Sequence, residues 1–362
     1  MSKRVLILSN SSLGLWDFRR ELIASLSKNN DVQVVTPDSG RMDDLRTLGC
    51  TVIDAPLERR GMNPVKDAKL LTYYLRLLRQ VKPDLVITYT VKPNVYGGLA
   101  CVLRGVPYAA NVTGLGTAFQ QEGLLRRIVT LLYRVGLRGA KVVFFENAAN
   151  AATAQREGIV EPERCCVLSG AGVNLTRYTP AEYPAEEGVR FLFVGRIMAE
   201  KGIRELMSAM ERLHREGAGC TLDVLGEFEE ESLRPALLQA QESGWLRYHG
   251  YQEDVRPYIA RSHCFVLPSY HEGMANTNLE CAAMARPLIT SRIPGCMEAV
   301  QEDVSGFLCT PQDADSLYEA MRRFLQLDAD ARRAMGLAGR AHVAEKFDKK
   351  KVVEATMEAL GV

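Results

Sequence analysis

The sequence of 362 residues has no uncharged apolar run of the roughly 20 residues that a membrane-spanning helix requires. The apolar run near its start, from Val5 to Leu8, is also too short for the core of a secretory signal. The nine cysteines show no Cys-x-x-Cys spacing, and an odd number argues against a closed disulfide framework. We therefore expect a cytoplasmic protein whose thiols are reduced.

Sequence motifs for two common classes of bound group are missing as well. No Gly-x-Gly-x-x-Gly fingerprint follows the first predicted strand, which counts against an NAD oxidoreductase. The two Asp-x-Asp pairs, at 313–315 and 328–330, fall at predicted helix starts, where helix capping accounts for them. We therefore predict no bound metal and no cofactor.

Short apolar runs alternate with helical patterns along the whole chain, which is typical of parallel βαβ units. The length suits two domains, and two prolines with several charges mark a boundary after residue 172. We predict an α/β fold with two Rossmann-like domains whose parallel sheets face each other across a cleft. The predicted parts are an N-terminal domain, a linker, a C-terminal domain and a last helix that packs back on the first domain: 1–172, 173–189, 190–348 and 349–362.

Charge is unevenly distributed between the two halves of the chain. Residues 1–169 contain 23 Lys+Arg and 15 Asp+Glu, a net charge of +8, whereas the whole chain carries +1. A basic half favours an anionic partner such as a membrane surface or a lipid phosphate. Nucleic acid is the other candidate, but no nucleic-acid motif accompanies the charge, so we predict none. Ordinary solvated surface charge is the remaining interpretation.

Residues 124–138 form one predicted helix on which the choice between a membrane contact and ordinary surface charge depends. Five of its apolar residues fall on one helical face, and four arginines lie around that face. The pattern fits a helix that lies on an anionic membrane, so the protein would be peripheral on the inner face of the cell membrane. It fits an ordinary helix packed on a domain core equally well.

Two glutamates, Glu272 and Glu280, stand eight positions apart between a predicted buried strand and a predicted helix. A strand, a glycine-containing loop and a helix start form a site for a phosphorylated ligand, because backbone N–H groups and the helix dipole point at one spot. Two carboxylates beside that spot can each bind a pair of sugar hydroxyls. A capping box made by Thr277 and Glu280 is the structural alternative.

A second motif opens the C-terminal domain. Gly195 ends a predicted strand and Gly202 starts a helix, so Arg196 and Lys201 lie in the loop at the strand's carboxyl end. An arginine fork and a lysine can together bind a diphosphate and stabilise it as it departs. Two solvated loop cations are the alternative interpretation.

Together these two motifs resemble those of the retaining glycosyltransferases of family 4, which have the GT-B fold. The resemblance covers essentially the whole chain and is most specific over residues 191–300. It implies metal-independent transfer of a hexose, with a UDP-sugar as co-substrate rather than a cofactor. An N-terminal acceptor-binding domain and a C-terminal nucleotide-sugar-binding domain are implied as well.

The resemblance also implies individual roles. Glu272, which would hold donor-sugar hydroxyls, is expected to be catalytic together with Arg196 and Lys201, and Glu280 would hold the ribose hydroxyls. Tyr251 would lie near the nucleobase, although a packed loop aromatic is an equal alternative. The remaining donor contacts are expected at Gly14, Gly250, Gly273, Met274, Ala275, Asn276 and Thr277.

The run Asn-Val-Thr-Gly-Leu-Gly at 111–116 resembles a subgroup of the family that extends polyprenyl-diphosphate-linked sugars for capsule, O-antigen or protein glycans. Acceptor contacts are accordingly expected at Lys92, Asn94, Asn111, Thr113 and Gly114, and we expect Lys92 and Asn94 to face the cleft. A glycine-rich turn explains the same glycines without a function. All five histidines lie beyond residue 200, whereas many relatives place a first-domain histidine beside the donor sugar. We therefore expect the front-face mechanism proposed for retaining relatives, in which the departing phosphate takes the acceptor proton.

The predicted function is transfer of a hexosamine, from UDP-GalNAc or UDP-GlcNAc, to a polyprenyl-diphosphate-linked glycan. A UDP-sugar epimerase and a transferase for soluble acceptors are alternative enzymes with the same fold. A non-catalytic nucleotide-sugar sensor is an alternative from another class, which the intact set of four charged residues opposes.

Overall fold

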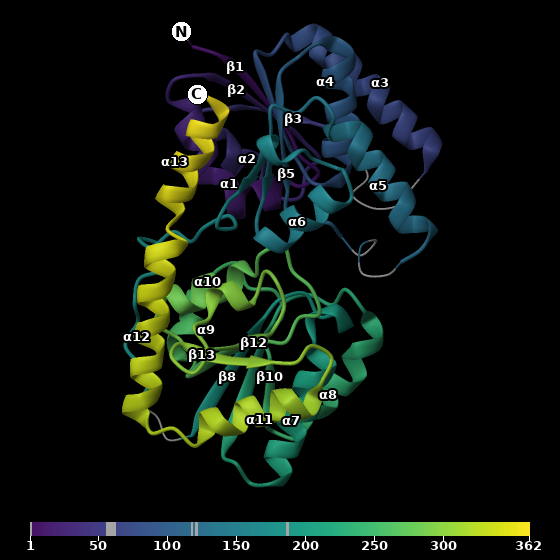
Figure 1. Cartoon of the computed structure of the whole chain (residues 1–362). Helices are drawn as coiled ribbons and strands as arrows, with labels where there is room; N and C mark the ends of the chain where they lie inside the picture. Colours follow the sequence, from purple (N-terminus) through teal and green to yellow (C-terminus); the bar gives the residue numbers. More distant parts are fainter. Residues whose placement is uncertain (1, 56–62, 117–118, 120–121, 186–187) are drawn as a thin grey trace. The chain divides into compact units, whose positions relative to one another are not determined.

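The computed structural model describes residues 2–55, 63–116, 119, 122–185 and 188–362. The chain divides into two compact units (Figure 1). Unit 1 consists of Met1–Ala171 and Lys350–Val362, and unit 2 consists of Gly172–Lys349.

Unit 1 contains a parallel sheet in the order β3-β2-β1-β4-β5-β6-β7. Its strands are β1 (Arg4–Leu8), β2 (Asp31–Thr36), β3 (Thr51–Asp54), β4 (Leu85–Tyr89), β5 (Tyr108–Val112), β6 (Val142–Phe145) and β7 (Cys165–Val167). Its α-helices are α1 (Ser12–Ser27), α2 (Met42–Arg46), α3 (Pro64–Val81), α4 (Gly98–Arg104), α5 (Leu124–Leu137), α6 (Ala148–Arg156) and α13 (Lys349–Leu360). A π-helical turn, η1 (Pro93–Gly97), precedes α4, and a 3₁₀ turn, η3 (Pro162–Arg164), precedes β7.

Helices cover both faces of the unit 1 sheet, which accounts for its two separate hydrophobic clusters. Strand β1 is an example: its successive side chains Leu6 and Ile7 point to opposite faces of the sheet, belong to different clusters and are both fully buried. Helix α13 contributes Val352 and Leu360 to the cluster that contains Ile7. The last helix of the chain is therefore part of the unit 1 core.

Unit 2 contains a second parallel sheet in the order β10-β9-β8-β11-β12-β13. Its strands are β8 (Val189–Val194), β9 (Cys220–Leu225), β10 (Leu246–Tyr248), β11 (Cys264–Leu267), β12 (Leu288–Ser291) and β13 (Gly306–Cys309). Its α-helices are α7 (Ile203–Arg215), α8 (Arg234–Glu242), α9 (Arg256–Arg261), α10 (Asn276–Ala283), α11 (Ala314–Leu325) and α12 (Ala329–Lys346). Three 3₁₀ turns are η4 (Ala199–Lys201), η5 (Glu231–Leu233) and η6 (Met297–Ala299).

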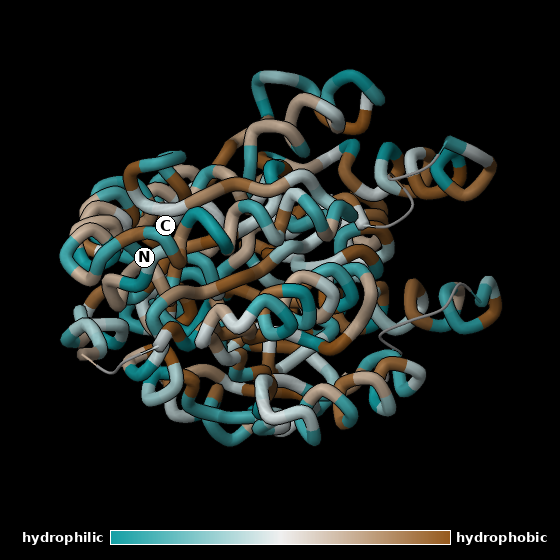
Figure 2. The backbone as a smooth tube through the Cα atoms, turned by 90° about the horizontal axis from the view of Figure 1, so that it is seen from below, coloured by the Kyte–Doolittle hydropathy of each residue, from teal (hydrophilic) through white to brown (hydrophobic). Residues whose placement is uncertain are grey.

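The chain's hydropathy follows this layering, since hydrophilic and hydrophobic stretches alternate along the helices in Figure 2. Two parallel sheets with helices around them confirm the predicted α/β fold class. Asp313 and Asp328 cap α11 and α12 through their side chains, as predicted. Within the described residues, no helix has the length and apolar character needed to cross a membrane.

The segment predicted as a linker differs from that expectation, because its described residues are held against unit 2. Arg286 is fully buried and donates hydrogen bonds to the carbonyl oxygens of Ala181 (3.1 Å) and Glu182 (2.6 Å). Arg340 donates to the carbonyl oxygen of Tyr178 at 2.8 Å. Composition alone marks this segment as a linker, whereas two distant arginines fix its backbone.

Candidate functional site

The segment that carries the two glutamates connects β11 to α10. All four residues of β11 are buried, and α10 begins at Asn276 after Ala275. No side chain among the described residues caps this helix start, and Thr277 lies within the first turn. The alternative of a capping box is therefore wrong, because it needs Thr277 as the cap residue. Glu280 lies half-buried in the second turn.

Glu272 is held by two donors on one carboxylate oxygen. Lys201 Nζ forms an ion pair with Glu272 Oε1, and Ser269 Oγ donates to the same oxygen at 2.8 Å. Ser269 is fully buried, and the side chains of Lys201 and Glu272 are 19% and 13% exposed. Sequence reasoning missed Ser269, although its place two residues after the strand and three residues before Glu272 was a usable signal.

A close backbone approach brings Lys201 to Glu272. Gly202 has a φ of +71°, and a Cβ atom there would lie 2.0 Å from the carbonyl oxygen of Pro268. Only glycine fits such a position without strain. Because β8 and β11 are neighbours in the sheet, the loop after β8 meets the loop after β11 at this contact.

Arg196, which follows β8, also contacts a carboxylate. Its Nη1 atom lies 3.3 Å from Oε2 of Glu229, and the arginine side chain is 45% exposed. Glu229 lies on the segment after β9, which continues the sheet through a parallel bridge between Ile197 and Phe228. Both cations expected to bind a diphosphate therefore contact carboxylates of unit 2.

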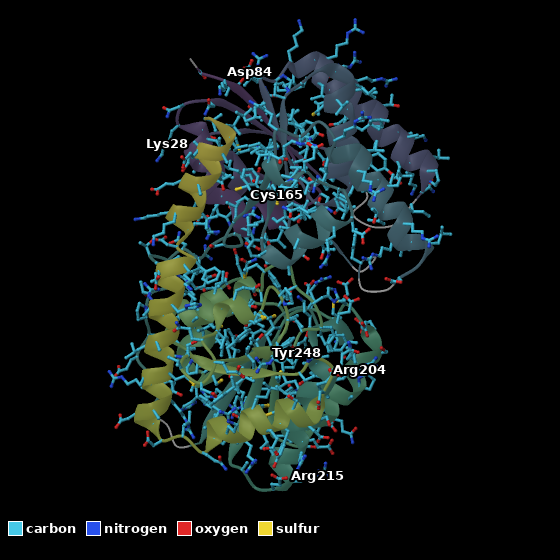
Figure 3. All side chains as sticks on the ribbon, viewed as in Figure 1. Lys28, Asp84, Cys165, Arg204, Arg215 and Tyr248 are labelled. Carbon is cyan, nitrogen blue, oxygen red and sulfur yellow. The ribbon has the colours of Figure 1, made fainter. Side chains whose placement is uncertain are left out.

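The predicted nucleobase loop lies beside these residues. Gly226 has a φ of +137°, a Cβ atom there would lie 1.9 Å from Gly195 O, and its N–H donates to Gly250 O at 2.9 Å. Tyr248, labelled with Arg204 in Figure 3, donates its hydroxyl proton to Gly226 O at 2.9 Å. The loops after β8, β9 and β10 therefore meet at the carboxyl edge of the sheet. Tyr251 is 53% exposed, so the alternative of a packed loop aromatic is wrong.

The backbone before α10 agrees only in part with the expected donor contacts. Met274 and Ala275 are buried, and the Ala275 N–H donates to Gly295 O at 2.7 Å. That N–H is engaged within the protein, whereas the expected donor contacts of these residues stay predictions. The side-chain oxygen Oδ1 of Asn276 is buried and has no hydrogen-bond partner among the described residues. An unpartnered buried oxygen at a helix start suits a ligand hydroxyl.

Neighbouring titratable side chains are engaged in other contacts. Tyr270 donates its hydroxyl proton to Glu205 at 2.8 Å, and burial together with this hydrogen bond raises the pKa of Tyr270. His271 Nε2 lies 3.5 Å from Glu200 Oε2. Burial, with a smaller contribution from the charge of Glu272, raises the pKa of the Cys296 thiol well above its usual value. Cys296 is therefore a protonated core residue rather than a nucleophile.

In unit 1, the expected acceptor residues lie after β4, within β5 and directly after β5. Lys92 Nζ pairs with Asp67 Oδ1 at 2.9 Å, and their side chains are only 14% and 11% exposed. Asn94 is fully buried; its Oδ1 accepts from Thr88 Oγ1 at 2.7 Å, and its Nδ2 donates to Asn111 O at 2.8 Å. The expectation that Asn94 faces an open cleft is wrong, because this side chain joins β4 to β5 inside the unit.

The other predicted unit 1 residues are placed differently. Asn111 is also buried, whereas Thr113 and Gly114 are partly exposed after β5. Gly14 lies in the first turn of α1, where a Cβ atom would meet only Ser11 atoms at 3.6 Å. Packing within the protein therefore does not require glycine at position 14. Thr90, which sequence reasoning missed, has a φ of +73°, a strained value for a β-branched residue at the end of β4.

Comparison with known protein families gives two matches along the chain. Residues 14–171 match the family model described as "Glycosyl transferase 4-like domain", and residues 188–327 match "Glycosyl transferases group 1". Among solved structures, the chain is similar to Anabaena HepE in complex with UDP-glucose, with a TM-score of 0.81 and 17% identity over 99% of both chains. It is also similar to sucrose-phosphate synthase from Thermosynechococcus elongatus, with a TM-score of 0.79 and 19% identity over 98% of both chains.

Two curated relatives resemble the chain over most of its length. The N,N'-diacetylbacillosaminyl-diphospho-undecaprenol alpha-1,3-N-acetylgalactosaminyltransferase of Campylobacter jejuni is 28% identical over 89% of both chains. The UDP-Gal:alpha-D-GlcNAc-diphosphoundecaprenol alpha-1,3-galactosyltransferase of Escherichia coli is 26% identical, over 81% of this chain and 79% of its own. With both family models matched in order and the two parallel sheets of a GT-B fold, the protein belongs to the family 4 glycosyltransferases.

Proposed function

We propose that this protein is a retaining, metal-independent transferase that moves a hexosamine from a UDP-sugar to a polyprenyl-diphosphate-linked glycan. The observation that carries the proposal is the contact of Lys201 with Glu272 at the carboxyl edge of the unit 2 sheet, with Arg196 on the same segment after β8. Such an edge is where open α/β sheets bind ligands. The product would enter capsule, O-antigen or glycoprotein glycan assembly.

In this proposal, two cations bind the diphosphate of the donor and a carboxylate binds its sugar. Arg196 and Lys201 bind the diphosphate and stabilise the negative charge that develops as UDP departs, without a metal ion. Ser269 and Lys201 both engage Oε1 of Glu272. Oε2 of Glu272 is therefore the oxygen that accepts from donor-sugar hydroxyls. Glu280 takes the ribose hydroxyls, and Gly250 and Tyr251 contact the base.

The chemical step is proposed on the position of the histidines, all five of which lie beyond residue 200. The bond between the anomeric carbon and the UDP oxygen breaks, and the acceptor hydroxyl attacks from the same face. The departing phosphate oxygen takes the hydroxyl proton, so the products are UDP and a glycoside of unchanged anomeric configuration. Asn111 and Thr113 are the polar residues nearest the expected place of a base, and neither side chain titrates near neutral pH.

The lipid-linked acceptor rests on the two curated relatives, which both carry diphosphoundecaprenol in their names. A hexosamine donor is the narrower part of the proposal, supported by the N-acetylgalactosaminyl activity of the Campylobacter relative. An acceptor of this kind resides in a membrane, so we place the protein on the inner face of the cell membrane. Lys92, Thr113 and Gly114 are the unit 1 residues proposed to contact the acceptor.

The test is UDP release from a panel of UDP-sugars, with and without a polyprenyl-diphosphate-sugar acceptor, followed by mass spectrometry of the lipid. Acceptor-dependent release with one added hexosamine supports the proposal. NMR of the product bond reports retention, and unchanged turnover in EDTA reports metal independence. Sugar conversion without an acceptor would instead indicate an epimerase, and binding without turnover would indicate a sensor.

A further inference from the structure

Helix α5 carries hydrophobic side chains on two opposite faces. Tyr133 and Leu137 are buried in the unit 1 core. A second set points away from the core at spacings of four, three and four residues, so it forms one row along the helix. This outer row consists of Leu124, Ile128, Leu131 and Val135, which are 74%, 40%, 60% and 42% exposed.

Close backbone packing fixes which face of α5 is outward. A Cβ atom at Gly136 would lie 2.5 Å from Cα of Val95, and one at Gly98 would lie 2.0 Å from Gly136 O. The backbone of α5 therefore contacts that of η1 and α4 with no room for side chains. The helix cannot rotate to bury its outer row without losing these contacts.

Three exposed arginines form a second row beside the first. Arg127, Arg134 and Arg138 are spaced by seven and four residues, which places them on one side of the outer row. Within the described residues, the side chains of Arg127 and Arg138 have no ion-pair partner. Unit 1 supplies further positive charge, since residues 1–169 carry 23 Lys+Arg against 15 Asp+Glu.

Exposed apolar side chains also lie on α4, close to the residues that follow α5. Val102 and Leu103 are 44% and 61% exposed, and a Cβ atom at Gly139 would lie 2.7 Å from Cγ2 of Val102. Contiguous exposed apolar surface on a protein marks an interaction site, and these side chains are candidates for one. An apolar row beside cationic side chains matches the boundary between anionic headgroups and acyl chains.

We propose that the outer row and the arginine row of α5 form a docking surface for a bilayer of anionic phospholipids. The apolar side chains enter the boundary between headgroups and acyl chains. Arg127 and Arg138 contact lipid phosphates, whereas Arg134 also donates to the carbonyl oxygen of Glu157. The groove beside the arginines is lined by three arginines and two glutamates: Arg126, Arg127, Arg134, Glu122 and Glu157.

This surface gives the proposed function a specific means of reaching a membrane acceptor. The two stand on different observations, because docking follows from α5 in unit 1 and catalysis from the loops of unit 2. Vesicle binding tests the first without any sugar donor. Turnover of a detergent-solubilised acceptor tests the second without a membrane.

The experiment is co-sedimentation of the full chain with vesicles of phosphatidylcholine alone and of phosphatidylcholine mixed with phosphatidylglycerol. We expect binding to the mixed vesicles that weakens as salt is raised. The triple variant Leu124→Ser, Ile128→Ser, Leu131→Ser should bind at least about tenfold more weakly. The double variant Arg127→Glu, Arg138→Glu should lose the preference for anionic vesicles.

Matched controls come from exposed residues of unit 2. Leu238→Ser with Leu337→Ser removes exposed leucines from α8 and α12, and Arg215→Glu reverses an exposed charge on α7 (labelled in Figure 3). All controls should bind vesicles as the parent does. Since every changed α5 residue is exposed, circular dichroism spectra should stay unchanged.

Two results would overturn the proposal. One is parental binding to anionic vesicles by both α5 variants. The other is a concentration-dependent dimer, seen by analytical ultracentrifugation, that the triple variant abolishes while vesicle binding persists. That second result would assign the outer row to contact with another copy of the chain.

Discussion

Arg196 and Glu229 form a salt bridge between the ends of two neighbouring strands, with 3.3 Å between Nη1 and Oε2. Arg196 follows β8 and Glu229 follows β9, and these strands pair in parallel. A diphosphate that binds Arg196 must compete with this carboxylate. In the free protein, the Glu229 carboxylate thus occupies the side of Arg196 that the diphosphate of the proposed donor would contact.

Replacing this carboxylate should strengthen nucleotide binding. In Glu229→Gln, we expect the affinity for UDP to rise about two- to fivefold, because a partly exposed pair is worth about 1 kcal/mol or less. Isothermal titration calorimetry measures the change. Glu231→Gln is the control, since Glu231 pairs with Arg234 on α8 at 2.7 Å. Unchanged or weaker binding in Glu229→Gln would show that Glu229 does not compete with the diphosphate.

The Lys201–Glu272 pair should matter for turnover more than for folding. Lys201→Ala and Glu272→Gln should each lower kcat at least about a hundredfold, because each removes a charge proposed to act in the transition state. The thermal midpoint should stay within a few degrees of the parent. Lys28→Ala, at an exposed position in unit 1 (Figure 3), is the control. A large loss of thermal stability in both variants would instead give the pair a structural role.

Arg286 should be among the most important polar residues for the stability of unit 2. It donates to the carbonyl oxygens of Ile259 and Ala260 as well as those of Ala181 and Glu182, and burial lowers its pKa. Removing the guanidinium in Arg286→Leu leaves these carbonyls without partners, so the free energy of unfolding should fall by about 3–5 kcal/mol.

Urea denaturation followed by circular dichroism measures that loss. Arg292→Leu is the control, because Arg292 pairs with Glu302 at an exposed position and should cost about 1 kcal/mol or less. A loss in Arg286→Leu no larger than in Arg292→Leu would contradict the assigned role.

The thiols should differ sharply in reactivity with pH. Seven cysteines are buried, whereas Cys165 and Cys166 are partly exposed. Burial raises the pKa of Cys220 and of Cys309 to about 11, so both remain protonated thiols well above neutral pH. Labelling with Ellman's reagent at pH 8 should therefore show at most two reacting thiols in the native protein and the rest only after denaturation.

The same assay identifies the two reactive positions. Raising the pH to 9 should speed the native reaction, because the thiolate fraction of Cys165 and Cys166 grows while the buried thiols stay protonated. The double variant Cys165→Ser, Cys166→Ser should abolish the native reaction. Rapid labelling of more than two thiols would show that the core of the native protein opens readily.

Sequence periodicity was sufficient to predict the two parallel sheets and the strand–loop–helix unit around Glu272. Buried parallel strands such as β11 appear in the sequence as short apolar runs. Polar and charged residues in the loops that follow such runs are therefore easy to recognise as candidate site residues. Glycine was informative for a similar reason. The sequence marks Gly202 as a helix start, and the structure adds that it lies against Pro268.

Sequence periodicity could not predict the hydrogen-bond partners that a side chain finds on other elements of the fold. Asn94 follows a strand and was expected to face a cleft, yet it bonds Thr88 and the Asn111 backbone in the interior. Its direction depends on η1, whose π-helical turn leaves no signature in the periodicity. β7 has three residues that are no more than partly buried, too little for an apolar run to reveal.

Helix α13 has a consequence for how the protein is made. Its residues Val352 and Leu360 complete a hydrophobic cluster whose other members come from the first half of the chain. Unit 2, at Gly172–Lys349, is continuous in sequence, and along the chain it separates the two segments of unit 1. During synthesis, the unit that starts first is thus the last to be finished. Nascent unit 1 must leave part of this hydrophobic cluster uncovered while the whole of unit 2 is translated. That interval is the time when chaperones have an apolar surface to recognise.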